Sequence, residues 1–98
     1  MVETIFPGIT TSRVGTPRLT ANVLERPSDA ATKTVLLVHG NTSSSLFWQP
    51  LMLDLPEDVR ALAVDLRGFG DSQTLPVDAT RGVRDFSDDV ASVIDALG

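Results

Sequence analysis

Two short apolar runs constrain the fold of this chain more than any other feature. Residues 34–38 (TVLLV) and 59–64 (VRALAV) are rich in aliphatic and β-branched side chains, and a small polar loop follows each of them. A strand that is apolar on both faces is typical of a parallel sheet covered by helices on both sides. The segment between the runs is long enough for a helix, so the pair predicts a parallel strand–helix–strand crossover.

Helical periodicity predicts two helices. Phe47, Leu51 and Leu55 recur at a helical spacing, with Trp48 and Met52 beside them, so a core-facing helix is expected to begin close to Phe47. The second helix ends the chain. Its apolar stripe contains Val83, Phe86, Val90, Val93, Ile94 and Leu97.

An N-terminal hairpin completes the predicted elements. Residues 11–14 and 19–25 carry strand-like side chains, and Gly15-Thr16-Pro17 lies between them as a turn. The resulting order is strand, strand, strand, helix, strand, helix, which defines the α/β class. A chain of 98 residues has room for one small domain, so residues 1–98 are assigned to one segment of a single domain.

Composition excludes several classes of protein. The chain has 8 basic and 13 acidic residues, and its arginines are scattered, so no nucleic-acid partner is expected. Because cysteine is absent, there are no disulfides, no thiolate metal site and no Cys nucleophile. The N-terminus has no targeting signal, and the apolar runs are far too short to span a bilayer. We therefore expect a cytoplasmic protein with no membrane partner.

The loops after the two apolar strands are the candidate ligand sites, because open α/β sheets bind ligands at the carboxyl ends of their strands. A phosphate cradle in the first loop would need the second glycine and the lysine of a P-loop, which are missing. A metal site would rest on His39 alone. An oxyanion hole fits better, because Gly40 allows close backbone approach and the Asn41 N–H would point into the crevice above the sheet. We predict no metal and no cofactor.

Two signatures in this order resemble the α/β-hydrolase superfamily. The first is a strand, His39-Gly40, a loop and a helix, and the second is the pattern Asp65-x-Arg67-Gly68-x-Gly70-x-Ser72 after the next strand. The resemblance covers residues 33–98, about two-thirds of the chain, and the hairpin is similar to the family's opening antiparallel strands. It implies the α/β-hydrolase fold, of which this chain would be the N-terminal portion.

The resemblance also implies roles for individual residues. The main-chain N–H of Asn41 would be the catalytic oxyanion donor, with Gly40 beside a small-molecule substrate that contains an ester, lactone or similar carbonyl. His39 would shape the loop and would not be the catalytic base. The residues expected to brace the loop after the fourth strand are Asp65, Arg67, Gly68, Gly70 and Ser72.

The catalytic triad of such a hydrolase is not in this sequence. The family needs a nucleophile on a Gly-x-Ser-x-Gly elbow, then an acid and then a histidine, and none of the three occurs here. Ser43, Ser44 and Ser45 are interpreted as loop and N-cap residues, since no base accompanies them. Without a fifth strand, residues 34–38 would form an exposed apolar edge. We therefore expect the C-terminal remainder of the same hydrolase to pack here as a second chain.

Two other functions remain open at this stage. The stretch from His39 to Ser44 is similar to the loop of haloalkane dehalogenases, although Thr42 stands where that family usually has proline. A dehalogenase or an epoxide hydrolase would carry an Asp nucleophile at the elbow. The non-enzymatic alternative is a small α/β binding module that is complete as it stands.

Overall fold

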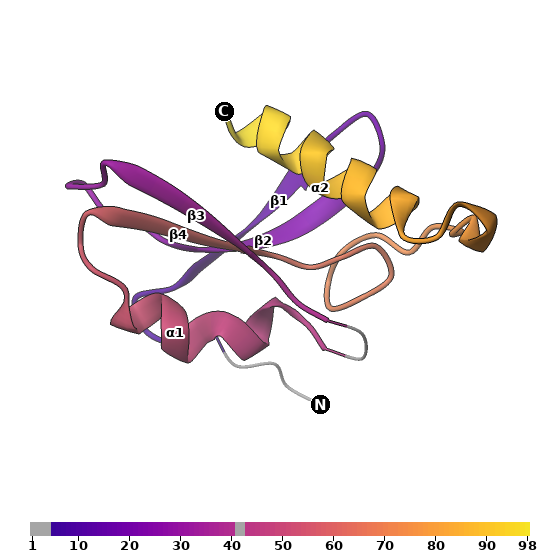
Figure 1. Ribbon diagram of the computed structural model, residues 1–98. Coiled ribbons are helices and arrows are strands. Elements are labelled where there is room, and N and C mark those ends of the chain that lie inside the picture. The colour runs from indigo at the N-terminus through magenta and orange to yellow at the C-terminus, as the bar shows by residue number, and fades with distance from the viewer. Residues whose placement is uncertain (1–4, 41–42) are drawn as a thin grey trace.

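The computed structural model describes residues 5–40 and 43–98 and shows a mixed four-stranded sheet (Figure 1). Its strands lie in the order β1-β2-β4-β3. Their bounds are Thr10–Gly15 for β1, Thr20–Arg26 for β2, Lys33–Val38 for β3 and Val59–Val64 for β4. The helical elements are η1 (Ser45–Trp48), α1 (Gln49–Asp54), η2 (Ala79–Arg81) and α2 (Arg84–Leu97).

The hairpin and the parallel strand pair follow the sequence prediction, and a third pairing joins them. β1 and β2 form an antiparallel hairpin whose turn is closed by a hydrogen bond from Thr16 N–H to the Leu19 carbonyl at 2.9 Å. β2 pairs with β4 in antiparallel register, with Val23 opposite Val64. β3 pairs with β4 in parallel, with Leu36 opposite Leu62. The parallel crossover and the α/β class are therefore confirmed.

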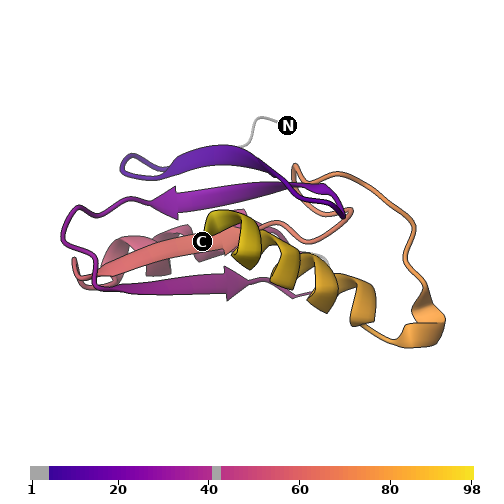
Figure 2. The same ribbon diagram turned by 90° about the horizontal axis from the view of Figure 1, so that it is seen from above.

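The helices cover opposite faces of the sheet (Figures 1 and 2). β4 is buried on both faces, and its side chains alternate between two core clusters. Leu62 and Val64 pack with Val93 of α2, whereas Ala61 and Ala63 pack with Met52 of α1. Because these alanines are small, α1 can lie close to the sheet. Helices on both faces are expected for a parallel strand pair.

Full burial of the third strand is not observed. β3 lies at the edge of the sheet, its apolar residues are half-buried, and Val38 is 42% exposed. The edge position itself agrees with the sequence prediction. β3 is exposed because it has a strand neighbour on one side only. The described elements therefore cover only part of the apolar run of residues 34–38.

The predicted core face of the first helix is correct only in part, since Met52 is buried and Trp48 and Leu55 pack partly buried against the core. α1 begins at Gln49, after the 3₁₀ turn η1, and Phe47 is 69% exposed, with Leu51 also exposed. The buried residues are Ser45, Gln49 and Met52, which are also helically spaced. Gln49 can be buried because its side-chain oxygen accepts a hydrogen bond from the main-chain N–H of Phe6 at 2.7 Å.

The predicted stripe of the last helix is correct only in part. Val93 is buried and Val90 and Leu97 are partly buried against the core, but Val83 and Ile94 are exposed. The N-terminal half of α2 instead buries Asp85 and Asp89. Arginines on other elements pair with these aspartates, so charged side chains are buried on the helix face that packs against the rest of the fold.

Candidate functional site

Parallel pairing of β3 and β4 places the loops after them at the same edge of the sheet. The first loop begins with His39 and Gly40, and the second includes residues 65–72. Asn41, the predicted oxyanion donor, lies outside the described residues. The site is therefore built from the residues on either side of it and from the second loop.

Main-chain groups engage both ring nitrogens of His39. Nε2 lies 2.9 Å from the donating N–H of Leu66, and Nδ1 lies 2.7 Å from the carbonyl oxygen of Gly40. This pattern requires a neutral ring with its proton on Nδ1. The ring is buried and meets the Phe69 ring edge-on, with centroids 5.3 Å apart. His39 thus links the two loops and offers no free nitrogen to act as a base.

Asp65 is the centre of a buried polar network. Its Oδ1 accepts a hydrogen bond from the Ser45 N–H at 2.7 Å, and its Oδ2 accepts from Asn22 Nδ2 at 2.9 Å and from the Asp71 N–H at 3.2 Å. Ser72 Oγ donates to the Asp65 carbonyl at 2.6 Å and accepts from the Asn22 N–H at 2.8 Å. The carboxylate therefore connects β2, the loop after β4 and the start of η1.

The two loop glycines are required for different reasons. Gly68 and Gly70 both have positive φ, of 78° and 51°. A Cβ at Gly68 would meet nothing within 4 Å, whereas a Cβ at Gly70 would lie closer than 3.0 Å to the carboxylate of Asp65. Gly68 supplies a left-handed turn, and Gly70 also makes the space that the buried carboxylate occupies.

Arg67, in the loop after β4, forms an ion pair with Asp89 of α2. Its Nε and Nη2 each donate to one oxygen of Asp89 at 2.8 Å, and Arg18 Nε donates to the same carboxylate at 2.8 Å. Hydrogen bonding to Asp89 raises the pKa of the Arg67 guanidinium above its ordinary value. This cluster of Arg18, Arg67 and Asp89 ties the hairpin turn and the loop after β4 to the N-terminal half of α2, so Arg67 braces the loop.

Asp85 sits beside this cluster and has a lowered pKa. The main reason is a hydrogen bond of 2.7 Å from the main-chain N–H of Asp78, which outweighs the opposite effect of burial. The positive charges of Arg81, Arg67 and Arg18 lower the pKa further. The carboxylate is therefore favoured in its ionised form.

This shift predicts an acid-dependent loss of stability. A lowered pKa in the folded state stabilises the fold fully above the ordinary value of 3.8, and the stabilisation is lost as pH falls below that value. In thermal unfolding between pH about 5 and about 2, the variant Asp85→Asn should lose Tm less steeply than the unsubstituted protein. Asp95→Asn, on the exposed side of the same helix, is the control. Identical slopes for all three proteins would contradict the prediction.

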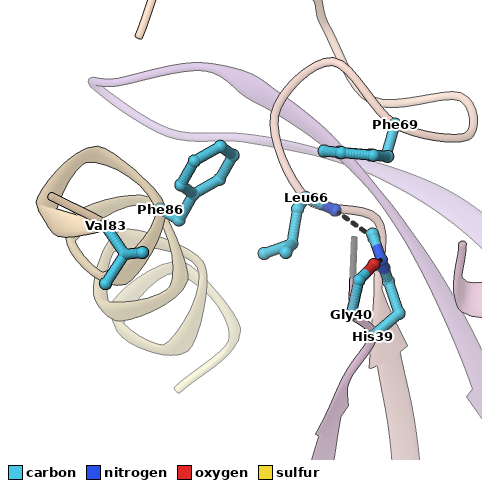
Figure 3. A pocket seen from close by; sticks show the side chains of 6 residues that line it. All are labelled: His39, Gly40, Leu66, Phe69, Val83 and Phe86. Carbon is cyan, nitrogen blue, oxygen red and sulfur yellow. Dashed lines mark hydrogen bonds between the residues drawn. The ribbon is translucent and has the colours of Figure 1, made fainter. Parts of the chain in front are cut away.

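The two loops and the start of α2 line an open pocket of about 340 Å³. Figure 3 shows Val83 and Phe86 on the α2 side, His39 and Phe69 on the loop side, and Leu66 between them. Gly40 completes the lining. No charged side chain is among these lining residues, so the described wall of the pocket is apolar. Its volume is in the range of pockets that bind small molecules.

Sequence reasoning missed some residues of this site. Asn22 interrupts an apolar strand, and a lone amide there is a signal of a buried polar contact. Phe86 was assigned to the core stripe, yet it lines the pocket. Of the three serines, Ser44 caps η1 by accepting a hydrogen bond from the Leu46 N–H, and Ser45 is buried beside Asp65.

Among residues 5–40 and 43–98, no three histidine or acidic side chains gather as a metal site would require. Within the same part of the chain, no helix has the length and apolarity needed to cross a bilayer.

A mixed sheet with helices on both faces, and with a pocket between the loops at the carboxyl ends of its parallel strands, defines an α/β protein with a candidate active site at that edge. Residues 35–98 match the sequence model of the Alpha/beta hydrolase family. The chain belongs to this family. The four strands and two α-helices of the described residues fit the N-terminal portion of the fold.

Individual relatives are hydrolases of different kinds. A 2-(acetamidomethylene)succinate hydrolase from Mesorhizobium japonicum is 36% identical over 87% of this chain. An epoxide hydrolase from Vigna radiata superposes on 97% of this chain with a TM-score of 0.79 and 25% identity. The superposed part is 30% of the epoxide hydrolase. A loop variant of a haloalkane dehalogenase from Bradyrhizobium elkanii superposes on 92% of this chain with a TM-score of 0.79 and 27% identity. The superposed part is 29% of the dehalogenase. The chain spans 29% of the length of the curated relative.

Proposed function

We propose that this chain forms part of a cofactor-free hydrolase of an ester, a lactone or a similar carbonyl substrate. The observation that carries the proposal is the pocket where the His39-Gly40 turn meets the loop after β4, at the carboxyl edge of the parallel strands. The main-chain N–H of Asn41, the residue after this turn, is assigned to the oxyanion that forms when the carbonyl is attacked. One such donor typically lowers the barrier by about 3–4 kcal/mol.

The nucleophile, acid and base are assigned to the C-terminal remainder of the hydrolase, packed against this chain. His39 supports this assignment, because it is the one histidine of the sequence and both its ring nitrogens are hydrogen-bonded to the main chain. The half-buried edge of β3 and the exposed Val83 and Ile94 supply apolar surface for such a partner. We propose that the remainder is cleaved from the same reading frame and packs as a separate chain, which mass spectrometry of the purified protein would detect.

The chemistry is tested by covalent labelling and turnover together. The protein is expressed from its full-length reading frame and incubated with a fluorophosphonate, and hydrolysis of p-nitrophenyl esters and aliphatic lactones is measured. We expect turnover of at least one substrate class, and loss of turnover in step with phosphonate labelling. If the 98-residue chain were active as a monomer, with no other polypeptide present, the assignment of the triad to the remainder would be contradicted. Absence of both labelling and turnover would overturn the proposed function.

The apolar pocket wall predicts the kind of substrate. Because the lining residues carry no cation, we expect an uncharged apolar group to lie against them, in contrast to the diacid that the Mesorhizobium relative is named for. Phe86→Ser should reduce the preference for a hexanoyl over an acetyl ester by about tenfold, since one apolar contact in a pocket is typically worth 10- to 200-fold in discrimination. Phe47→Ser removes an exposed phenyl ring outside the pocket and should leave the preference unchanged. Equal preference in all three proteins would refute this specificity.

A second candidate is an epoxide hydrolase or a haloalkane dehalogenase with an Asp nucleophile. It is favoured by the structural similarity to the epoxide hydrolase from Vigna radiata and to the dehalogenase from Bradyrhizobium elkanii. An apolar pocket would also suit an epoxide or a haloalkane. Turnover of styrene oxide or 1-bromobutane, without phosphonate labelling, would select this candidate over the first.

A further inference from the structure

Two consecutive residues hold both ends of the segment that joins β3 to η1. At its start, His39 Nε2 accepts a hydrogen bond from the Leu66 N–H at 2.9 Å. At its end, the Ser45 N–H donates to Asp65 Oδ1 at 2.7 Å. Because Asp65 and Leu66 are adjacent in the chain, the two attachment points are fixed relative to each other.

The Asp65 carboxylate itself has little freedom to move. Asn22 Nδ2 and the Asp71 N–H hold its second oxygen, at 2.9 and 3.2 Å, and the backbone of Gly70 lies against it. The side chain is buried, as are Asn22 and Ser45. Charge-assisted hydrogen bonds are strong in such surroundings, so the position of Ser45 follows that of the carboxylate.

We propose that Asp65 is a positioning residue for the loop after β3, in addition to bracing its own loop. Through Ser45 it fixes one end of the segment, while Leu66 fixes the other through His39. The proposal rests on the proposed function, because it matters for the reaction only if this loop carries the oxyanion donor. Asp65 does not line the pocket, so it acts on the reaction through the loop.

Asp65→Asn tests this role with little change in size. An asparagine presents one oxygen and one NH₂ group, so in either orientation a donor faces the Ser45 N–H or the pair formed by Asn22 and Asp71. We expect kcat for the best ester substrate to fall by about 10- to 100-fold, because a loop shift of about 1 Å is enough for such a loss. KM should stay within about twofold, and affinity for a trifluoromethyl ketone, which mimics the oxyanion, should fall in parallel with kcat.

Thr11→Val is the matched control. Thr11 Oγ1 donates to Asn22 Oδ1 at 2.9 Å, at the far end of the same network, and has no hydrogen bond to the described residues of the loop after β3. The substitution should lower stability while kcat stays within about twofold of the unsubstituted value. A loss of kcat in Thr11→Val equal to that in Asp65→Asn would overturn the positioning role, because stability alone would then explain both.

Amide hydrogen exchange separates the positioning role from the proposed function. In the protein expressed from its full-length reading frame, Asp65→Asn should speed exchange in the peptide that spans residues 36–46 by about tenfold or more, and Thr11→Val should not. Unchanged exchange in Asp65→Asn would overturn the inference even in an active enzyme. If the unsubstituted protein hydrolyses no carbonyl substrate, the proposed function fails, whereas the exchange result still decides whether Asp65 anchors the loop.

Discussion

Gly70→Ala is expected to lower the free energy of unfolding by about 3–5 kcal/mol, one of the largest effects of a single methyl group in this chain. The new Cβ would lie closer than 3.0 Å to the Asp65 carboxylate, which cannot retreat without breaking hydrogen bonds from Ser45, Asn22 and Asp71. Alanine also disfavours the φ of 51° at this position. Urea unfolding of the protein expressed from its full-length reading frame measures the loss.

Gly68→Ala is the matched control for the same loop. Its φ of 78° is also left-handed, but its Cβ would meet nothing within 4 Å. This variant should therefore lose only the backbone contribution, about 1–2 kcal/mol. The difference between the two variants isolates the contact with Asp65. If both variants lost the same free energy, the close packing of Gly70 on the carboxylate would be contradicted.

The main features of the fold were predictable from local sequence. Two runs of apolar strand residues with a helix between them define a parallel crossover, and the turn at Gly15-Thr16-Pro17 defines the hairpin. Of the loop residues that the family resemblance marks, His39, Gly40 and Asp65 lie at the carboxyl edge of the sheet, whereas Asn41 lies outside the described residues. These features depend on side-chain periodicity and turn chemistry, which act within a few residues.

The faces of the helices were not predictable in the same way. Periodicity selected Phe47 and Val83, which are exposed, and did not indicate that Gln49 and Asp89 are buried. Burial of these polar side chains depends on partners distant in the chain: Phe6 for Gln49, and Arg67 for Asp89. A single sequence contains no information on such pairs, so an apolar stripe assigns a helix but leaves its rotation undetermined.

The ion pair between Arg67 and Asp89 is expected to be the most stabilising of those on α2. Both side chains are almost fully buried, with exposed fractions of 9% and 4%, and the contact is bidentate. Arg67→Met would leave Asp89 buried with Arg18 alone, a guanidinium that is itself 32% exposed. We expect a loss of about 3–4 kcal/mol in urea unfolding, because breaking a buried pair leaves an undercompensated charge. Arg67→Lys should recover only part of the loss, since lysine cannot bond both oxygens in the same plane.

Arg84 provides the comparison on the same helix. Its pair with Asp88 has exposed fractions of 66% and 32%, so Arg84→Met should cost no more than about 0.5 kcal/mol. The double variant Arg67→Met/Asp89→Leu should be more stable than Arg67→Met, because it removes the unpaired charge and replaces it with apolar surface. A double variant less stable than Arg67→Met would contradict this expectation, because Asp89 would then stabilise the fold through Arg18 even without Arg67.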